Sequence, residues 1–168
     1  MEITTLSSFI EYYQRIKGRT DKLVRLVPPS HLEFRYRPGK FSPGDLIRHI
    51  AATERFMYAE VVVGRPSVYH GCHRELADGY DHLLGYYNQL RGEAMDIFRQ
   101  LSAEDLQKKC LTPAGISMTA WKWLRAMIEH EIHHRGQLYT CLGMLGIATP
   151  PIFGMTAPEV EARSRHLH

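Results

Sequence analysis

The sequence predicts an all-α fold, a four-helix bundle, formed by a single domain over residues 1–168. Three observations lead to this prediction. Apolar side chains recur every three or four residues through four separate stretches, which is the spacing that places them on one face of a helix. Proline or glycine residues close three of these stretches, and most connections between them are short, as in helical bundles. The chain has 168 residues, 44% of them hydrophobic, and no repeat or linker-like tract divides it, so one core can be buried.

The first helix is predicted over residues 6–27. Its apolar pattern stops at Pro28 and Pro29, because proline interrupts helical hydrogen bonding. The apolar stripe consists of Leu6, Phe9, Ile10, Tyr13, Ile16, Leu23 and Leu26. The segment from there to Gly44 contains four prolines and a brief alternation of apolar and charged residues over 32–37. We therefore expect an ordered connector that is partly extended.

The second helix has a well-defined predicted start. Ser42 supplies an N-cap hydroxyl, Pro43 occupies the first helical position, and Asp45 places a carboxylate near the third. The apolar pattern then continues to about Val63, where glycine and proline follow. The inward stripe consists of Leu46, His49, Ala52 or Thr53, Phe56 and Glu60. A histidine is therefore expected among core positions.

The third helix is predicted to begin at Leu76 or Tyr80 and to end at Leu101. The serine and acidic residues over 102–105 predict a short capped turn after it. A Pro-x-Gly turn over 112–115 has short apolar flanks on both sides. This pattern predicts a small hairpin before the last helix.

The fourth helix is predicted over residues 119–145, with Gly146 and the prolines after it as its end. Its inward stripe consists of Trp123, Met127, His130, His134, Gln137, Cys141 and Met144. Two histidines thus share one face with apolar core positions. Beyond Pro151 we expect only a peripheral turn and a frayed end.

Composition and charge exclude several classes of protein. The 21 Lys and Arg residues are nearly balanced by 18 Asp and Glu residues and are spread along the chain, whereas a nucleic-acid-binding protein needs a clustered basic face. No apolar run approaches the roughly 18 residues that a membrane span requires, and the acidic, polar start lacks the pattern of a secretory signal. The three cysteines are far apart, which favours reduced thiols. We therefore expect a cytoplasmic protein with no nucleic-acid or membrane partner.

Ten histidines are the unusual feature of the composition. His130 and His134 are four residues apart, so on a helix their rings project from one face and can share one metal ion. Burying both is costly unless every ring nitrogen has a partner, and a shared ion supplies one. His49 is the best candidate for a third ligand, because it lies mid-helix on an apolar stripe. Three imidazoles with an open position are typical of a catalytic zinc site. The remaining histidines are predicted to lie at the surface: His31, His70, His73, His82, His133, His166 and His168.

The same segment fits two other kinds of site. Read as H-E-x-x-H, residues 130–134 match the zinc-protease motif with Glu131 as general base, and Glu159 or Glu161 could be the third ligand by spacing. Against this, Gln137 replaces the glycine of the metzincin continuation, and no substantial sheet precedes the helix. The E-x-x-H spacing within the segment would suit a carboxylate-bridged di-metal bundle, but the sequence holds no second such motif.

Two motifs together resemble the DinB-like family of metalloenzymes. They are residues 42–54, S-P-G-D-L-I-R-H-I-A-A-T-E, and residues 130–139, H-E-I-H-H-R-G-Q-L-Y. The order of helices and the late segment P-P-I-F-G-M-T are also similar to that family, so the resemblance spans nearly the whole chain. The resemblance implies a four-helix bundle with a three-histidine metal site at His49, His130 and His134, nickel or zinc as the ion, and a homodimer. Some relatives are transferases and isomerases that depend on the thiols bacillithiol or mycothiol, and the family name does not imply DNA binding.

These observations lead to two hypotheses of different classes. In the first, the protein is a metal-dependent enzyme in which a divalent ion activates a water or a low-molecular-weight thiol for S-transfer, isomerisation or hydrolysis of a small molecule. Glu131 and Glu54 are the candidates for acid–base roles, although neither lies squarely on the ligand stripe. Arg135 could contact an anionic substrate, although an arginine in this position is more often solvated or paired. In the second hypothesis, the protein is a non-catalytic, stress-associated bundle whose ion ties two helices together.

Overall fold

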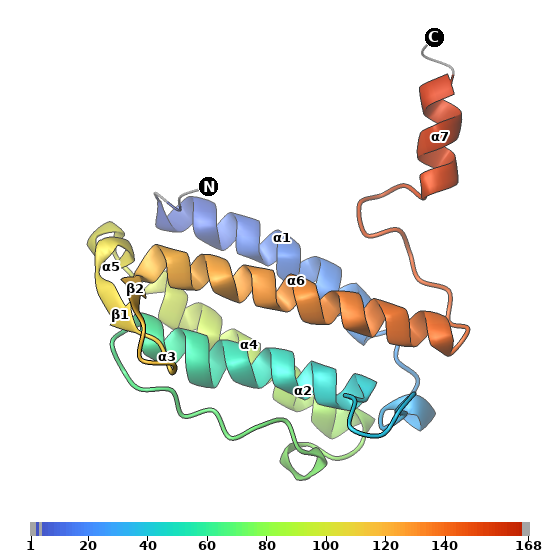
Figure 1. Cartoon of the computed structure of the whole chain (residues 1–168), viewed down its shortest axis with the longest axis horizontal. Helices are drawn as coiled ribbons and strands as arrows, with labels where there is room; N and C mark the ends of the chain where they lie inside the picture. The colour runs from blue at the N-terminus through green and yellow to red at the C-terminus, as the bar shows by residue number, and fades with distance from the viewer. Residues whose placement is uncertain (1–2, 4, 166–168) are drawn as a thin grey trace.

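The computed structural model describes residue 3 and residues 5–165, and its four long helical segments form the expected bundle (Figure 1). Three of these segments are single helices: α1 (Leu6–Val24), α4 (Tyr80–Arg99) and α6 (Ala120–Met144). The remaining segment consists of α2 (Pro43–Thr53), the π-helical turn η2 (Glu54–Tyr58) and α3 (Ala59–Val62). The predicted four-helix bundle is confirmed. Among the described residues, no helix has the length and apolar character needed to cross a bilayer.

The helices are neighbours in space in a different order from their order along the chain. α6 packs against α1 and against α2, while α4 packs against α2 and, with fewer contacts, against α1. The consecutive helices α1 and α2 therefore lie diagonally across the bundle, and the connector over residues 25–42 passes across one end of it. Helical periodicity alone could not predict this order. Its consequence is that α2, which carries His49, lies beside α6, which carries His130 and His134.

The second helical segment begins as the sequence predicts and then departs from regular α-helix. Ser42 and Asp45 form a reciprocal capping box, in which the Asp45 backbone N–H donates to Ser42 Oγ at 3.0 Å and the Ser42 N–H donates to Asp45 Oδ2 at 2.9 Å. The predicted end near Val63 is also confirmed, since α3 ends at Val62. In between, the π-helical turn η2 widens the helix, a feature often found next to functional sites.

The predicted short turn and hairpin before the last helix are both present. The turn is the helix α5 (Ala103–Gln107), which Ser102 and Asp105 cap in the same reciprocal manner as at the start of α2. The hairpin pairs β1 (Lys109–Leu111) with β2 (Ser117–Thr119) in antiparallel register, with Cys110 opposite Met118. The hairpin leads directly into α6.

The structure differs from the sequence predictions in three places. α1 ends at Val24, a little before the predicted end, and a turn follows. The connector after it contains a short 3₁₀ helix, η1 (Pro29–His31), and turns, with no strand in this described stretch. The tail contains a further helix, α7 (Ala157–Arg165), which projects away from the bundle and buries none of its residues. Thr156 and Glu159 explain its start: the Thr156 N–H donates to Glu159 Oε2 at 2.6 Å, and the Glu159 N–H donates to Thr156 Oγ1 at 3.4 Å.

Polar side chains divide the apolar core into two halves. One half contains residues from the first part of α1 and α6 and the last part of α4, whereas the other contains α2 and the opposite ends of those helices. Between the halves lies a set of side chains that we call the polar layer: Lys17, Thr20, His49, Glu54, Arg91, His130, Glu131 and His134. Burying so many polar groups is unfavourable unless each has a partner, so the contacts within this layer decide what it can do.

Candidate metal centre

The three predicted histidines meet in the polar layer. His130 Nε2 lies 3.2 Å from His49 Nε2 and 3.1 Å from His134 Nε2. One nitrogen from each ring lies within 4.8 Å of the other two, and no further His, Cys, Asp or Glu of the described residues joins this group. Tetrahedral zinc has Zn–N distances near 2.0–2.1 Å, which separates its ligand nitrogens by roughly 3.3 Å. The two shorter separations are close to this value, so the donor set fits a divalent ion.

The chemical state of the rings also fits a metal. Burial, together with the neighbouring His134, lowers the pKa of His49 to about 4. Burial and the adjacent imidazoles lower the pKa of His130 to about 3, and burial lowers the pKa of His134. At neutral pH all three rings are therefore uncharged, and each neutral ring has one nitrogen with a free lone pair.

A side chain on α6 fixes which nitrogen of His134 is free. Gln137 Oε1 lies 2.9 Å from His134 Nδ1, and Gln137 Nε2 lies 3.0 Å from His133 Nε2. A carbonyl oxygen only accepts, so His134 Nδ1 must carry the proton and donate it. The lone pair of His134 is then on Nε2, which faces His130. This is the arrangement expected of a metal-binding histidine whose outer nitrogen is held by a second residue.

The π-helical turn orients His49 in a comparable way. The backbone N–H of Val68 donates to the carbonyl oxygen of Phe56 at 2.8 Å, and Ser67 Oγ donates to the same oxygen at 3.3 Å. These bonds hold the loop after α3 against η2. The loop in turn places the hydroxyl of Tyr69 2.7 Å from His49 Nδ1, so that Nε2 faces the other histidines.

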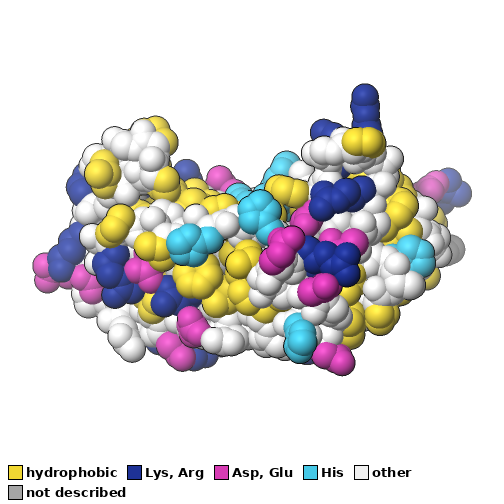
Figure 2. All heavy atoms as spheres, turned by 90° about the horizontal axis from the view of Figure 1, so that it is seen from below, with side chains coloured by type: hydrophobic (Ala, Val, Ile, Leu, Met, Phe, Trp, Pro, Cys, Tyr) yellow, Lys and Arg dark blue, Asp and Glu magenta, His cyan; other side chains and the backbone are white. Residues whose placement is uncertain are grey.

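Aromatic rings cover the histidines on two sides. The ring of Phe41 lies 5.3 Å from His49 and 6.1 Å from His134, measured between ring centroids. The ring of Tyr58 lies 5.7 Å from His130. Seen from below, the molecular surface is hollowed between two raised parts, and histidine side chains gather in and beside the hollow (Figure 2). His49 and His130 are half-buried, so the site is partly covered and can still be reached from solvent.

A second group of polar residues fills the other side of the layer. Glu131 accepts hydrogen bonds from Tyr13 Oη at 2.8 Å and from Thr20 Oγ1 at 2.6 Å, both on α1. Arg91, on α4, donates to both oxygens of Glu131, at 3.0 and 3.2 Å, and its Nη1 also lies 3.2 Å from Glu54 Oε2. All four long segments of the bundle therefore meet here.

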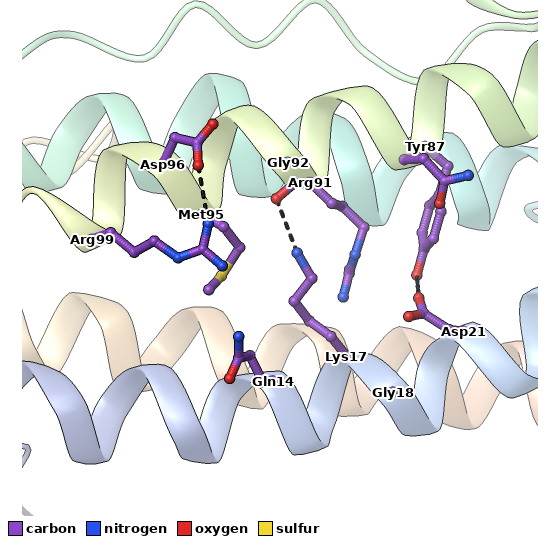
Figure 3. Close-up of a pocket in the computed structure, with 11 residues that line it drawn as sticks. Gln14, Lys17, Gly18, Asp21, Tyr87, Arg91, Gly92, Met95, Asp96 and Arg99 are labelled. Atoms are coloured by element: carbon purple, nitrogen blue, oxygen red, sulfur yellow. Dashed lines mark hydrogen bonds and ion pairs between the residues drawn. The ribbon is translucent and has the colours of Figure 1, made fainter.

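Lys17 completes this group and closes it toward solvent. Its ammonium donates to the carbonyl oxygen of Arg91 at 2.9 Å and lies 3.5 Å from Glu54 Oε1. Figure 3 shows Lys17 reaching across a groove between α1 and α4, with the side chain of Arg91 pointing between the helices. We call Lys17, Glu54, Arg91 and Glu131 the charge cluster. Its two cations and two carboxylates balance, as buried charges must.

The structure therefore separates the predicted site residues into two groups. His49, His130 and His134 are brought together, whereas Glu54 and Glu131 belong to the charge cluster. Both oxygens of Glu131 are already hydrogen-bonded to α1 and α4, which leaves it poorly placed for the general-base role of an H-E-x-x-H protease.

The other candidates lie away from the histidines as well. Glu159 and Glu161 are exposed on α7 and are not part of the histidine group. The sequence predicts a solvated or paired Arg135, or one that contacts an anion. It is instead buried against α1, with Nη1 3.5 Å from the carbonyl oxygen of Ile16, because it lies one residue, or about 100°, round the helix from His134.

The remaining histidines follow the surface prediction where they are described. His70, His73, His82 and His133 are exposed and His31 is half-buried, whereas His166 and His168 lie outside the described residues.

Sequence reasoning missed the residues that orient the three histidines. Gln137 could have been assigned, because it lies three residues after His134 on the same stripe. Tyr69 gives no such signal, since it lies in an irregular loop whose position depends on η2.

Comparisons with known proteins identify the fold and the family. The protein is 24% identical over 150 residues to the uncharacterised protein YjoA of Bacillus subtilis, a match that covers 88% of this chain and 95% of YjoA. Among solved structures, a DinB-like protein from Bacillus cereus has a TM-score of 0.74 at 18% identity, with 88% of this chain and 97% of that chain covered. YfiT from Bacillus subtilis, described as a probable metal-dependent hydrolase with an unusual four-helix bundle topology, has a TM-score of 0.67 at 15% identity, covering 85% and 89%.

A mycothiol-dependent maleylpyruvate isomerase has a TM-score of 0.62 at 14% identity, covering 81% of this chain and 63% of that chain. At such identities these structures establish the fold alone. The family model of the DinB superfamily matches residues 12–138, a stretch that includes His49, His130 and His134. This match extends over more than half of the 168 residues and confirms the resemblance found in the sequence. The chain therefore belongs to the DinB superfamily.

Proposed function

We propose that the protein is a metal-dependent enzyme that acts on a small molecule. The observation that carries the proposal is the meeting of three uncharged imidazoles, whose Nε2 atoms lie 3.1 and 3.2 Å apart in the two closest pairs. A divalent ion bound there would lower the pKa of a water or a thiol in its open coordination position. Imidazole ligands favour zinc or nickel over manganese, so we propose one of these two as the ion.

The residues of this chain would do three things for such a reaction. His49, His130 and His134 would hold the ion. Gln137 would keep the proton on Nδ1 of His134, and Tyr69 would hold Nδ1 of His49, so that the Nε2 atoms of both rings face one centre. The rings of Phe41 and Tyr58 would exclude water from part of the site, which strengthens electrostatic interactions inside it.

We propose transfer, isomerisation or hydrolysis as the class of reaction, with a low-molecular-weight thiol as cosubstrate in the first two cases. This part of the proposal is supported by the fold shared with YfiT and with the mycothiol-dependent isomerase, whose descriptions name a probable metal-dependent hydrolase and a thiol-dependent enzyme. The near balance of positive and negative charge supports a small-molecule substrate and argues against nucleic acid.

Elemental analysis tests the metal part of the proposal directly. The protein should be purified without a polyhistidine tag, stripped with a chelator and reconstituted with zinc or nickel, and should bind about one ion per chain. His130→Ala should abolish binding, while His82→Ala, at an exposed histidine of α4, should leave it unchanged. Substoichiometric metal that does not rise on reconstitution would contradict the proposal.

A panel of thiols and electrophiles then tests the catalytic part. We expect the zinc- or nickel-loaded protein to turn over at least one pair, and His130→Ala to remove that activity. The alternative function is a metal-binding bundle without catalysis, which is favoured by one feature: the ligands come from two helices, α2 and α6, so an ion would tie them together. A large rise in melting temperature on metal binding, without turnover of any pair, would support that alternative.

We also propose that the protein forms a homodimer. An apolar hollow of about 610 Å³ between α1 and α6 supports this, because it includes the partly exposed side chains of Tyr12 and Ile132. Sedimentation velocity should give twice the mass of the chain. Ile132→Lys, which places a charge in the hollow, should shift the protein to monomer, and a wild-type protein that sediments as a monomer would contradict the proposal.

A further inference from the structure

A cleft opens beside the histidine group but is separate from it. It lies between residues 36–41 of the connector and the last turns of α6. Its volume is about 720 Å³, which is within the range of pockets for small molecules. Three large side chains in its wall are well exposed: Tyr36 by 49%, Phe41 by 40% and Met144 by 55%. Leu46 and Cys141 are buried and form its floor. Apolar surface of this kind, left open to water, is typical of a binding site.

The wall that the connector contributes is held in place by charged contacts. Arg35 Nη1 donates to the carbonyl oxygen of Lys40 at 2.6 Å, and Arg35 Nη2 lies 2.8 Å from Asp45 Oδ2 at the start of α2. Glu33 is hydrogen-bonded to the buried Arg48. Two ion pairs thus anchor the connector to the first turns of α2, one at Asp45 and one at Arg48, so the cleft is a built feature of the fold.

The charge around the cleft is positive. Lys40 is its one charged lining residue, and none of the described residues that line it is acidic. The nearest acidic side chains of the connector and of α2, Glu33 and Asp45, are paired with arginines. An anionic group in the cleft would therefore find an exposed ammonium and no opposing carboxylate.

Two residues that line the cleft also contact the histidine group. Phe41 lines the cleft and also packs against His49 and His134, and Gln137 lines the cleft and accepts a hydrogen bond from His134 Nδ1. A molecule that occupies the cleft would thus lie against the residues that cover and orient the metal ligands. This continuity indicates the occupant: a small molecule that reacts at the metal, and not a second protein.

We propose that this cleft binds the substrate, and that the substrate is an amphipathic small molecule with an apolar body and one anionic group. The apolar body lies against Phe41, Leu46 and Met144, and the anionic group lies at Lys40. That the bound molecule is a substrate rests on the proposed metal-dependent function. The binding itself does not, because the cleft is formed by the connector, Leu46 of α2 and α6, without any metal ligand in its lining.

A pair of fluorescent probes tests the two parts of this proposal on the metal-free protein. 8-Anilinonaphthalene-1-sulfonate has an apolar body and one anionic group, and N-phenyl-1-naphthylamine is its neutral counterpart. We expect both to bind. Lys40→Gln should weaken sulfonate binding by about fivefold, the effect of one partly exposed charge pair, and leave the neutral probe unchanged. Lys22→Gln, at an exposed lysine of α1, is the matched control and should change neither.

Three further variants show where the probes bind and whether their binding depends on the metal site. Thr140→Trp fills the cleft from an exposed position and should abolish the binding of both probes. Ile132→Lys, in the other apolar hollow, should leave both bound. His130→Ala should keep probe binding even though it loses the metal, so a failure of the metal site and a failure of the cleft give different results.

Near-ultraviolet circular dichroism should show that each variant retains its tertiary structure. The proposal would be overturned if Thr140→Trp still bound both probes, if Ile132→Lys removed them, or if Lys40→Gln left sulfonate binding as in the wild type.

Discussion

The charge cluster allows one stability prediction to be worked out from the structure. Arg91 is buried and is the cation that contacts both carboxylates, Glu131 at 3.0 and 3.2 Å and Glu54 at 3.2 Å. Arg91→Met replaces the guanidinium by an uncharged side chain that fills part of the same space. Lys17 is then the only cation of the charge cluster beside two buried carboxylates. Removing one partner of a buried ion pair costs about 3–5 kcal/mol, a large share of the roughly 5–15 kcal/mol that stabilises a typical domain.

The loss should depend on pH in a direction that the structure fixes. Burial alone would raise the pKa of Glu131, but the charge of Arg91 and the hydrogen bonds it receives outweigh burial and lower it. Burial raises the pKa of Glu54 despite Arg91 and Lys17. Without Arg91, both folded-state pKa values should lie above those of the unfolded chain. The variant then loses stability as pH rises through these raised folded-state pKa values. Below about pH 4, where the carboxyls are protonated, its stability approaches that of the wild type.

Urea unfolding followed by far-ultraviolet circular dichroism, in the presence of a chelator, measures this effect. Arg99→Met is the control, because Arg99 is an exposed arginine of the same helix paired with an exposed aspartate, and it should change stability by less than about 0.5 kcal/mol. An Arg91→Met protein within about 1 kcal/mol of the wild type at pH 7, or a difference that stays constant on acidification, would refute the reasoning.

Three other predictions concern the histidines and the start of α2. The metal-free protein should lose stability as pH falls from about 6.5 toward 4. The cause is that histidines of the unfolded chain take up protons in this range, whereas folded His49 and His130, with pKa values of about 4 and 3, do not. His130→Gln should make the stability less dependent on pH, as measured by unfolding at a series of pH values. Tyr69→Phe and Gln137→Leu should each lower metal affinity by about 10- to 100-fold in chelator competition while the fold is kept, and unchanged affinity would contradict their orienting role. Ser42→Ala should cost about 1 kcal/mol in urea unfolding through loss of the capping box, and a neutral effect would contradict it.

The meeting of three histidines could be predicted from the sequence because helical phase carries the information. The four-residue spacing of His130 and His134 places both rings on one face of any regular helix, and His49 lies on an apolar stripe of its own. The long helices and the capping boxes of α2 and α5 could be predicted for the same reason, because each depends on residues close together in the sequence. Tyr69 and Phe41 could not be predicted, since each reaches the site from a connector.

The contacts of Glu131 could not be predicted from the sequence. Its place in an H-E-x-x-H motif suggested general-base chemistry, yet the donors that occupy it, Tyr13, Thr20 and Arg91, lie on α1 and α4, far away in the sequence. Which helix packs beside which is decided by the whole core, so no short motif could show that this carboxylate faces away from the histidines.

The adjacent positions of His130 and Glu131 explain why the histidine group and the charge cluster occur at one level of the bundle. Successive residues of a helix are separated by about 100°, so if His130 faces α2, Glu131 must face another neighbour. Because a buried carboxylate is tolerated only where donors meet it, the contacts of Glu131 with α1 and α4 allow α6 one rotation about its axis. That rotation is the one in which His130 and His134 face His49. The charge cluster, although it touches none of the three ligands through a hydrogen bond, therefore holds the helix that carries two of them in the orientation that the site requires.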